Sequence, residues 1–250
     1  MSRFVAGRYE LKFLISHRQQ ERMLQEVERW VVPDTNGVDG CYRVTSQYYD
    51  TDDLQAYWEK LDGVNQRMKF RLRYYGGEPE SPFFEIKHRQ NRIIMKERVG
   101  LQKPLARELL STEMGLDELS AGARPKNESE LQFAKRLELL GQKFDLGPKV
   151  VISYLRTAFL GSENSRVRLT FDHHCRAYRA GEFQAVSLEN GEPLEAGDPI
   201  VMELKFDNSI PKWLRDAANH VGAKGVRFSK YSKGMDALAL TRGSVSSESP

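Results

Sequence analysis

The sequence KFRLRY spans residues Lys69–Tyr74 and alternates cationic side chains with apolar ones. Successive side chains of an extended strand point to opposite faces, so a strand here places its cations on one face. The apolar residues between them then share the other face. The pattern therefore predicts a strand that separates an ionised surface from a hydrophobic one.

Five other segments repeat this alternation, with acids among the cations. They are Arg8-Glu10-Lys12, Glu85-Lys87, Lys96-Arg98, Arg166-Arg168-Asp172 and Glu203-Lys205. The simplest interpretation is an antiparallel sheet with its polar face in water. Like charges placed directly opposite each other destabilise a sheet, however. A face that is almost entirely ionisable is easier to explain if it binds a polyanion.

Helical patterns interrupt the predicted strands. Ser16, with Gln19 three residues later, forms a capping box that predicts a helix over Arg18–Val31. Asn127 is an N-cap for a predicted helix over Glu128–Leu140 that stops at Gly141. Further helices are expected at Leu105–Leu119, from the cap Asp50–Asp53 to Leu61, at Pro211–His220 and at Ser232–Leu240. Further strands are expected at Tyr42–Tyr49, Gln66–Val99 (with turns at Gly76-Gly77 and Gln90-Asn91), Val150–Phe159, Arg166–Tyr178, Glu182–Ser187 and Ile200–Phe206. This order predicts an α+β fold with a large antiparallel sheet or barrel.

A closed sheet would turn the ionised faces into a binding site. Eight strands make a barrel just wide enough to hold a small ligand. With the ionised face inward, the lumen is a basic tunnel, and helices pack on the apolar outer face. Arginine suits phosphate because its planar fork donates two hydrogen bonds to one phosphoryl group. The acids Glu10, Glu85 and Glu203 would then supply oxygen ligands for Mg²⁺ or Mn²⁺, together with phosphate oxygens.

Composition sets the class of protein. The 250 residues carry a formal net charge of +3, too little for a general nucleic-acid coat, so no nucleic-acid partner is expected. No apolar run approaches the roughly 20 residues that span a bilayer. The two cysteines are too few for a disulfide framework, which favours a cytoplasmic location. We expect a single domain over residues 1–240 and a disordered Ser-rich tail over residues 241–250.

Eight short strings, in this order along the chain, resemble one known family. They are RYELKFLI (Arg8–Ile15), YYDT (Tyr48–Thr51), KFRLRYYG (Lys69–Gly76), FFEIKHR (Phe83–Arg89), YLRTAF (Tyr154–Phe159), RVRLTFD (Arg166–Asp172), VMELKFD (Val201–Asp207) and RFSKYSKG (Arg227–Gly234). The sequence is similar, over about residues 3–240, to the VTC domain. That domain is the polyphosphate polymerase of the vacuolar transporter chaperone complex. It belongs to the triphosphate tunnel metalloenzymes, a CYTH-like superfamily whose eight-stranded antiparallel barrel encloses a basic tunnel.

The resemblance implies roles for particular residues. Arg71 and Arg73 would hold the nucleotide's phosphates, and Glu203 would bind the metal, with Glu10 and Glu85 as further candidate ligands. Phosphate contacts are also expected from Lys12, Lys69, Lys87, Lys96, Arg98, Arg156, Arg168, Lys205, Lys230 and Lys233. The expected catalytic groups are Arg71, Arg73, Lys87, Arg168 and Glu203. Hydrolytic members of the superfamily often open with Glu-x-Glu-x-Lys, whereas Arg8 replaces the first Glu here.

The activity implied is a metal-dependent transfer of the γ-phosphoryl group of ATP to a growing inorganic polyphosphate chain, with release of ADP. The cofactor would be Mn²⁺ or Mg²⁺. Two alternatives stay open at this point. The same tunnel could hydrolyse inorganic triphosphate or a nucleoside triphosphate, or the chain could bind polyphosphate without reacting. A membrane partner protein that receives the polymer is also compatible with the sequence, as is any oligomeric state.

Overall fold

The alternating strands and the helix caps form the predicted kinds of element in a computed structural model of the protein. The structure describes residues 8–76, 82–90, 93–102, 122–182, 186–187 and 190–241. Several expected features lie wholly or partly outside these ranges: the helix Leu105–Leu119, the turns at Gly76-Gly77 and Gln90-Asn91, the strand Glu182–Ser187 and the tail beyond Thr241. Among the described helices, none combines the length and the apolar character needed to cross a bilayer.

The chain divides into two compact units, each built from separated segments. Unit 1 comprises Met1–Arg43, Tyr154–Cys175 and Glu195–Ser229, and unit 2 comprises Val44–Ser153, Arg176–Leu194 and Lys230–Pro250. Three strands contribute residues to both units: β3 (Cys41–Asp50), β8 (Gly147–Gly161) and β9 (Arg168–Arg179).

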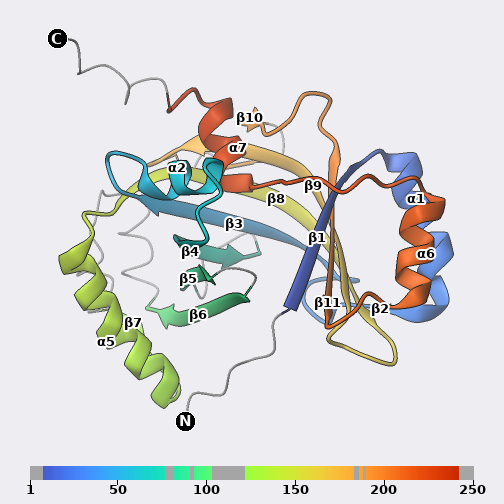
Figure 1. Cartoon of the computed structure of the whole chain (residues 1–250), viewed down its shortest axis with the longest axis horizontal. Coiled ribbons are helices and arrows are strands. Elements are labelled where there is room, and N and C mark those ends of the chain that lie inside the picture. The colour runs from blue at the N-terminus through green and yellow to red at the C-terminus, as the bar shows by residue number, and fades with distance from the viewer. Residues whose placement is uncertain are drawn as a thin grey trace. The chain divides into compact units, whose positions relative to one another are not determined.

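Unit 1 is a sheet with two helices on its apolar face. Its strand order is β1-β11-β9-β8, and β2 pairs with β8. The additional elements are β1 (Arg8–Ile15), β2 (Val31–Pro33), β11 (Ile200–Asp207), α1 (His17–Val27), the 3₁₀ turn η1 (Glu28–Trp30) and α6 (Lys212–His220). Figure 1 shows α1 and α6 side by side. Met23 of α1 and Leu214 of α6 join Phe171 and Met202 in the unit's hydrophobic core.

Unit 2 also combines strands with helices that pack against them. Its strand order is β8-β3-β4-β5-β6-β7, and β10 pairs with β9. The additional elements are β4 (Gln66–Tyr75), β5 (Phe83–Gln90), β6 (Ile93–Leu101), β7 (Ala123–Arg124), β10 (Glu192–Pro193), α2 (Gln55–Leu61), α5 (Glu128–Lys143) and α7 (Lys230–Ala237). Helix α5 packs against β6 (Figure 1) and buries Phe133 and Leu137 against Leu72 and Phe84 of the sheet.

These units confirm the α+β class, with mostly antiparallel strand pairs and helices on the apolar face. The eight-stranded barrel is not confirmed, because the strand pairings among the described residues form one open sheet. Strand β1 pairs with β11 alone at one edge of unit 1, and β7 pairs with β6 alone at one edge of unit 2. The described residues form eleven strands rather than eight. The single domain expected over residues 1–240 stays a prediction.

Helix boundaries differ from the sequence predictions where tertiary contacts decide them. The Ser16 capping box is confirmed, but α1 ends at Val27, because the β-branched Val31 and Val32 pair with β8 as strand β2. The Asn127 cap is also confirmed, although α5 continues past Gly141 to Lys143.

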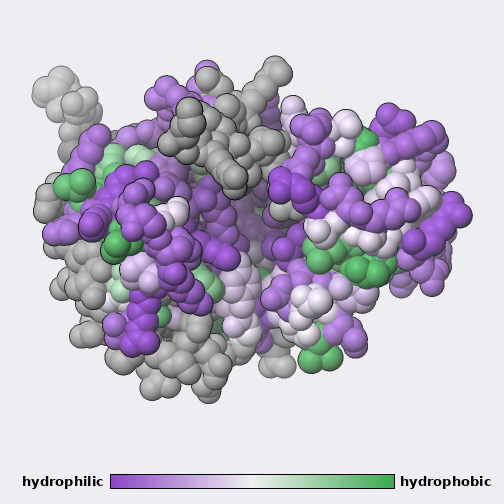
Figure 2. All heavy atoms as spheres, turned by 90° about the horizontal axis from the view of Figure 1, so that it is seen from below, coloured by the Kyte–Doolittle hydropathy of each residue, from purple (hydrophilic) through white to green (hydrophobic). Residues whose placement is uncertain are grey.

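Figure 2 shows one face of the protein, on which the coloured residues are mainly hydrophilic with small hydrophobic patches.

Candidate functional site

The polar face of unit 2 brings together predicted phosphate-binding residues from β4, β5 and β6. Their antiparallel registers place side chains of the same face directly opposite each other. Two cross-strand rows result, Arg71–Glu85–Arg98 and Lys69–Lys87–Lys96. Like charges in such positions destabilise a sheet, so the lysine row must be stabilised by its surroundings or by a bound anion.

Glu85 lies at the centre of this cluster and is only 1% exposed. One of its carboxylate oxygens lies 2.7 Å from Nη2 of Arg71 and 4.0 Å from Nη1 of Arg73, and Lys96 forms an ion pair with the other oxygen. Burial raises the pKa of Glu85, but Arg71, Arg73 and Lys96 together lower it well below its usual range. Three cations therefore surround one carboxylate, which leaves net positive charge on this part of the face.

We expect the ionisation of Glu85 to make the free energy of unfolding of unit 2 depend on pH in the acidic range. Because its folded-state pKa is depressed, its contribution is fully present above the unfolded pKa of about 4.3 and is lost as the pH falls toward the folded value. Urea denaturation between pH 6 and pH 3 should therefore show a shallower loss of stability for Glu85→Gln than for the wild type. Parallel curves for the two proteins would contradict this assignment.

Two buried polar residues of β3 hold the arginines of β4. Ser46 Oγ accepts a hydrogen bond of 2.9 Å from Nε of Arg73, and the Tyr48 hydroxyl accepts one of 3.4 Å from Nη1 of Arg71. Burial raises the pKa of Tyr48, but the neighbouring cations Arg71, Arg73 and Lys230 lower it by a larger amount. The pKa of Tyr48 therefore lies below its usual value. The alternating sequence pattern indicated no role for Ser46 or Tyr48. Their positions opposite Arg73 and Arg71 in the strand register explain these contacts.

The remaining predicted cations of unit 2 lie on β4, β5, β6 and α7. The Lys69 ammonium lies 5.2 Å from the ring centroid of Tyr231, and the Arg98 guanidinium lies 5.0 Å from that of Phe83. Lys230 and Lys233 are both on α7, where Lys230 is buried. Unit 2 thus contains Lys69, Arg71, Arg73, Lys87, Lys96, Arg98, Lys230 and Lys233 of the predicted phosphate-binding set.

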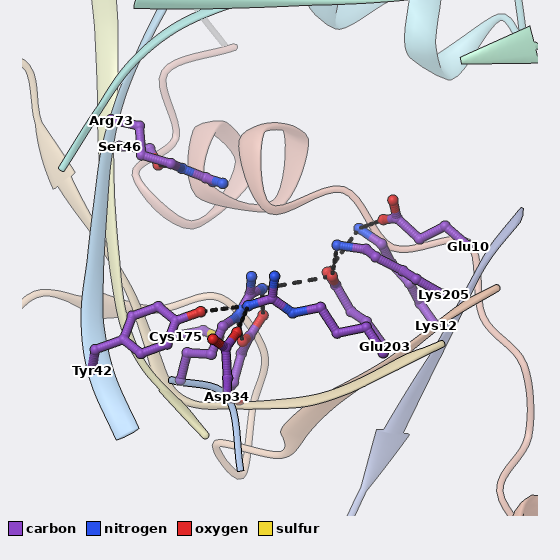
Figure 3. A network of polar contacts seen from close by, with 12 residues as sticks. Glu10, Lys12, Asp34, Tyr42, Ser46, Arg73, Cys175, Glu203 and Lys205 are labelled. Carbon is purple, nitrogen blue, oxygen red and sulfur yellow. Dashed lines mark hydrogen bonds and ion pairs between the residues drawn. The ribbon is translucent and has the colours of Figure 1, made fainter. Parts of the chain in front are cut away.

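The polar face of unit 1 contains a second cluster, centred on Glu203 of β11. The register places Lys12 opposite Glu203 and Glu10 opposite Lys205. Glu203 is 4% exposed, and its carboxylate lies 3.3 Å from Nζ of Lys12, 3.0 Å from Nζ of Lys205 and 3.6 Å from Nη2 of Arg156. Figure 3 shows Lys12 reaching between Glu203 and Glu10. The predicted metal ligand is therefore a buried carboxylate within a ring of cations.

Arg156 is held by a residue that received no role in the sequence analysis. Asp172 of β9 accepts hydrogen bonds of 2.6 and 2.8 Å from Nε and Nη2 of Arg156, and both side chains are buried. Burial lowers the pKa of Arg156, but the Asp172 carboxylate raises it well above its usual value. Asp172 ends the alternating segment Arg166-Arg168-Asp172. The alternation therefore indicated on which face of the strand Asp172 lies, but it did not indicate the contact with Arg156.

Arg168 is positioned by two residues that the sequence pattern did not reveal. Its Nη2 donates a hydrogen bond of 2.6 Å to the Tyr42 hydroxyl and lies 2.6 Å from the Asp34 carboxylate. Asp34 follows β2 in a loop and is 4% exposed. A backbone hydrogen bond of 2.8 Å from Asp34 N–H to the Ala158 carbonyl fixes that loop.

Gly40 is required for this support of Arg168. Its φ is +74°, and a Cβ there would lie 2.5 Å from the backbone oxygen of Ala158. We expect Gly40→Ala to lower the free energy of unfolding by about 2–5 kcal/mol, from left-handed strain and overpacking together. Gly222→Ala is the matched control in unit 1, because Gly222 has φ +67° with nothing within 4 Å of the added Cβ. Equal losses in the two variants, measured by urea denaturation, would show that the close approach is unimportant.

The three predicted metal ligands do not form one set within a unit. Glu10 and Glu203 belong to unit 1 and Glu85 to unit 2, and no group of three or more His, Cys, Asp or Glu side chains suited to a metal occurs in the described part of the chain. The Lys12 ammonium lies 3.2 Å from Glu10 and 3.3 Å from Glu203, so a positive charge is stable between these two carboxylates. Two carboxylates suit Mg²⁺ or Mn²⁺ when substrate phosphates and water supply the other ligands.

Unit 2 also has a cavity of about 360 Å³ that is not lined by Glu85 or its three cations. It lies where β4 begins and β5 ends. Its apolar lining includes Met68, Phe70, Phe144 and Leu146, and Asp50 lies at its wall. None of the predicted phosphate-binding or metal-binding residues lines it.

Comparison with known proteins agrees with these observations. The chain is 25% identical over 231 residues to vacuolar transporter chaperone complex subunit 4 of Schizosaccharomyces pombe, in an alignment that covers 80% of this chain and 32% of that protein. The chain thus spans about a third of the length of that relative. One similar solved structure is that of HpAC1 from Hippeastrum, a candidate adenylyl cyclase with a dominant triphosphatase activity. Its superposition on this chain has a TM-score of 0.54 at 10% sequence identity, and it covers 93% of this chain and 96% of HpAC1. This likeness shows a shared fold.

A family model settles the relationship at the level of sequence. The model of the VTC domain matches residues 7–239, which is most of the chain. The match includes every residue of the Glu85 and Glu203 clusters. It confirms the resemblance predicted from the eight short strings, and the protein belongs to the VTC domain family.

Proposed function

We propose that the chain is a metal-dependent phosphotransferase that moves the γ-phosphoryl group of ATP onto a growing inorganic polyphosphate chain and releases ADP. The observation that carries the proposal is the Glu85 cluster, where three cations surround one buried carboxylate. Such a cluster attracts polyanions strongly, because burial reduces the screening of its charges by water. Membership of the VTC domain family supports phosphate chains as the polyanion.

Arg71 and Arg73 would bind phosphoryl oxygens of the nucleotide, held in place by Tyr48 and Ser46. The terminal oxygen of the acceptor chain attacks the γ-phosphorus in line. A new P–O bond forms to the acceptor, and the bond from the γ-phosphorus to the bridging oxygen breaks, so that its electron pair leaves with ADP. This reaction requires positioning and charge stabilisation rather than a protein nucleophile.

Glu203 and Glu10 would hold the divalent metal, jointly with phosphate oxygens. Bound there, Mn²⁺ or Mg²⁺ would neutralise charge on the transferring phosphoryl group. Lys12, Lys205 and Arg156 would orient the Glu203 carboxylate, because all three lie within 3.6 Å of it. A closed tunnel, a cytoplasmic location and a protein partner are further parts of the proposal. The last is suggested by the relative that is a subunit of a complex.

The products formed from ATP test this function. The purified chain is incubated with ATP and Mn²⁺, and the products are separated into ADP, orthophosphate and polyphosphate. ADP with polymer supports the proposal. ADP with orthophosphate alone would show a triphosphatase, and absence of turnover with retained polyphosphate binding would show a binding module. Either of the last two results overturns the polymerase assignment.

A further inference from the structure

Tyr231, on α7 of unit 2, lies at the centre of a group of aromatic and cationic side chains. Its ring stacks on that of Tyr48, with centroids 5.3 Å apart and planes inclined by 27°. The Lys69 ammonium lies 5.2 Å from the centroid of the same ring. Tyr231 is 2% exposed and Tyr48 6% exposed, so these contacts form away from bulk water.

The hydroxyl group anchors Tyr231 to the protein. It donates a hydrogen bond of 2.5 Å to Oδ2 of Asp50, which is 1% exposed. The same carboxylate accepts hydrogen bonds from the backbone N–H groups of Ala56 and Tyr57 at 2.9 and 3.0 Å, and so caps the first turn of α2. Burial and the neighbouring Asp50 carboxylate raise the pKa of Tyr231 far above its usual value, so the hydroxyl stays protonated.

Tyr48 continues the chain of contacts to the arginines. Its hydroxyl accepts the hydrogen bond from Arg71, and the Arg71 guanidinium carbon lies 6.0 Å from its ring centroid. Two cations of the polar face, Lys69 and Arg71, therefore each lie against one ring of the stacked pair. An aromatic ring positions a cation without adding a formal negative charge that would compete with phosphate.

We propose that Tyr231 and Tyr48 form an aromatic platform that positions Lys69 and Arg71 for binding a phosphate chain. Tyr231 is a positioning residue that acts through Lys69 and through Tyr48, and Asp50 fixes its orientation. The inference rests on the proposed function, because phosphate is the ligand for which the two cations are positioned. Neither the family strings nor the alternating pattern assigned a role to Tyr231, although it lies between Lys230 and Lys233 in the string RFSKYSKG.

Substitutions at Tyr231 separate the ring from the hydroxyl. We measure the affinity of the full chain for inorganic triphosphate by titration calorimetry without metal. Tyr231→Phe keeps the ring and should bind triphosphate within about twofold of the wild type, although it loses stability. Tyr231→Leu removes the ring and should bind about five- to tenfold more weakly, a loss between those of an exposed and a desolvated cation–π contact. Tyr231→Met fills the space flexibly and replaces Tyr231→Leu if that variant does not fold.

A control and a double variant test the mechanism. Tyr57 is the matched control, because its hydroxyl likewise donates a 2.5 Å hydrogen bond to a carboxylate, that of Asp236, and its ring meets Tyr231 edge-on. Tyr57→Leu should lose stability but bind triphosphate as the wild type does. In a Lys69→Met background, Tyr231→Leu should weaken binding much less than it does alone, because much of its effect passes through Lys69.

The outcomes distinguish this inference from the proposed function. If the wild type does not bind triphosphate, the proposed function fails, and the platform fails with it. If the wild type binds but Tyr231→Leu binds equally well, the platform alone is wrong. The same conclusion follows if Tyr57→Leu weakens binding as much as Tyr231→Leu does, or if the effects of Lys69→Met and Tyr231→Leu are fully additive.

Discussion

Glu203→Gln is expected to lower the turnover of ATP by a factor of about 100–1000, the loss typical of removing one group that stabilises transition-state charge. The substitution keeps the size of the side chain and removes its negative charge. Because a neutral amide is a poor ligand for Mg²⁺ or Mn²⁺, the proposed metal site would lose its buried carboxylate.

The affinity for triphosphate should not fall together with turnover. Lys12, Lys205 and Arg156 all lie within 3.6 Å of the Glu203 carboxylate, so their charges would be less neutralised in the variant. Triphosphate affinity measured without metal is therefore expected to stay the same or to increase. This combination of lost turnover and retained binding distinguishes an enzyme from a passive polyphosphate-binding module.

The measurement compares kcat for ATP and Kd for inorganic triphosphate in the two proteins. Glu163→Gln, in an exposed loop of unit 1, removes one negative charge elsewhere and should change neither quantity. Turnover of Glu203→Gln at the wild-type rate would remove Glu203 from the mechanism. A parallel loss of binding and turnover would instead show that the substitution disrupts the structure.

Asp172→Asn is expected to lower the free energy of unfolding by about 3–5 kcal/mol, the usual result of breaking a buried ion pair from one side. Asp172 is completely buried and accepts two hydrogen bonds from Arg156, which is itself 6% exposed. The substitution leaves the guanidinium without its bidentate partner, and Glu203 at 3.6 Å does not replace those bonds. Urea denaturation at neutral pH measures the loss.

An exposed ion pair of the same kind provides the control. Arg166 and Asp207, also in unit 1, form a bidentate pair in which the Arg166 side chain is 55% exposed. Asp207→Asn should leave the urea midpoint unchanged, because solvent screens this pair. The double variant Arg156→Met with Asp172→Leu should recover much of the lost stability, since neither charge remains buried alone. Equal effects of Asp172→Asn and Asp207→Asn would contradict this account.

The alternating pattern predicted the two faces of most strands correctly, although Tyr9 and Leu11 on the predicted apolar face of β1 are exposed. A period of two leaves only two ways to assign the side chains of a strand to its faces. The apolar faces pack on helices, as Leu72 does against α5 and Met202 does against α1 and α6. The capping signals at Ser16 and Asn127 are equally local and were also confirmed. Local features of this kind depend on neighbouring residues, and the sequence shows those directly.

Contacts between distant strands were harder to predict. Lys12 and Glu203 are 191 positions apart, and only the pairing of β1 with β11 brings them together. Asp34 and Tyr42 lie outside any alternating segment, so no periodic signal connected them with Arg168. The metal-binding role of Glu10, Glu85 and Glu203 stays a prediction, because the structure divides these residues between the two units.

Label transfer to an acceptor chain tests the central claim most directly. The chain is given ATP labelled in the γ-phosphate, together with Mn²⁺ and unlabelled inorganic triphosphate, and the labelled products are resolved by chain length. Transfer predicts label in tetraphosphate first and then in longer chains, with ADP formed in equal amount. Label found only in orthophosphate would contradict the account and show that water, rather than a phosphate chain, accepts the phosphoryl group.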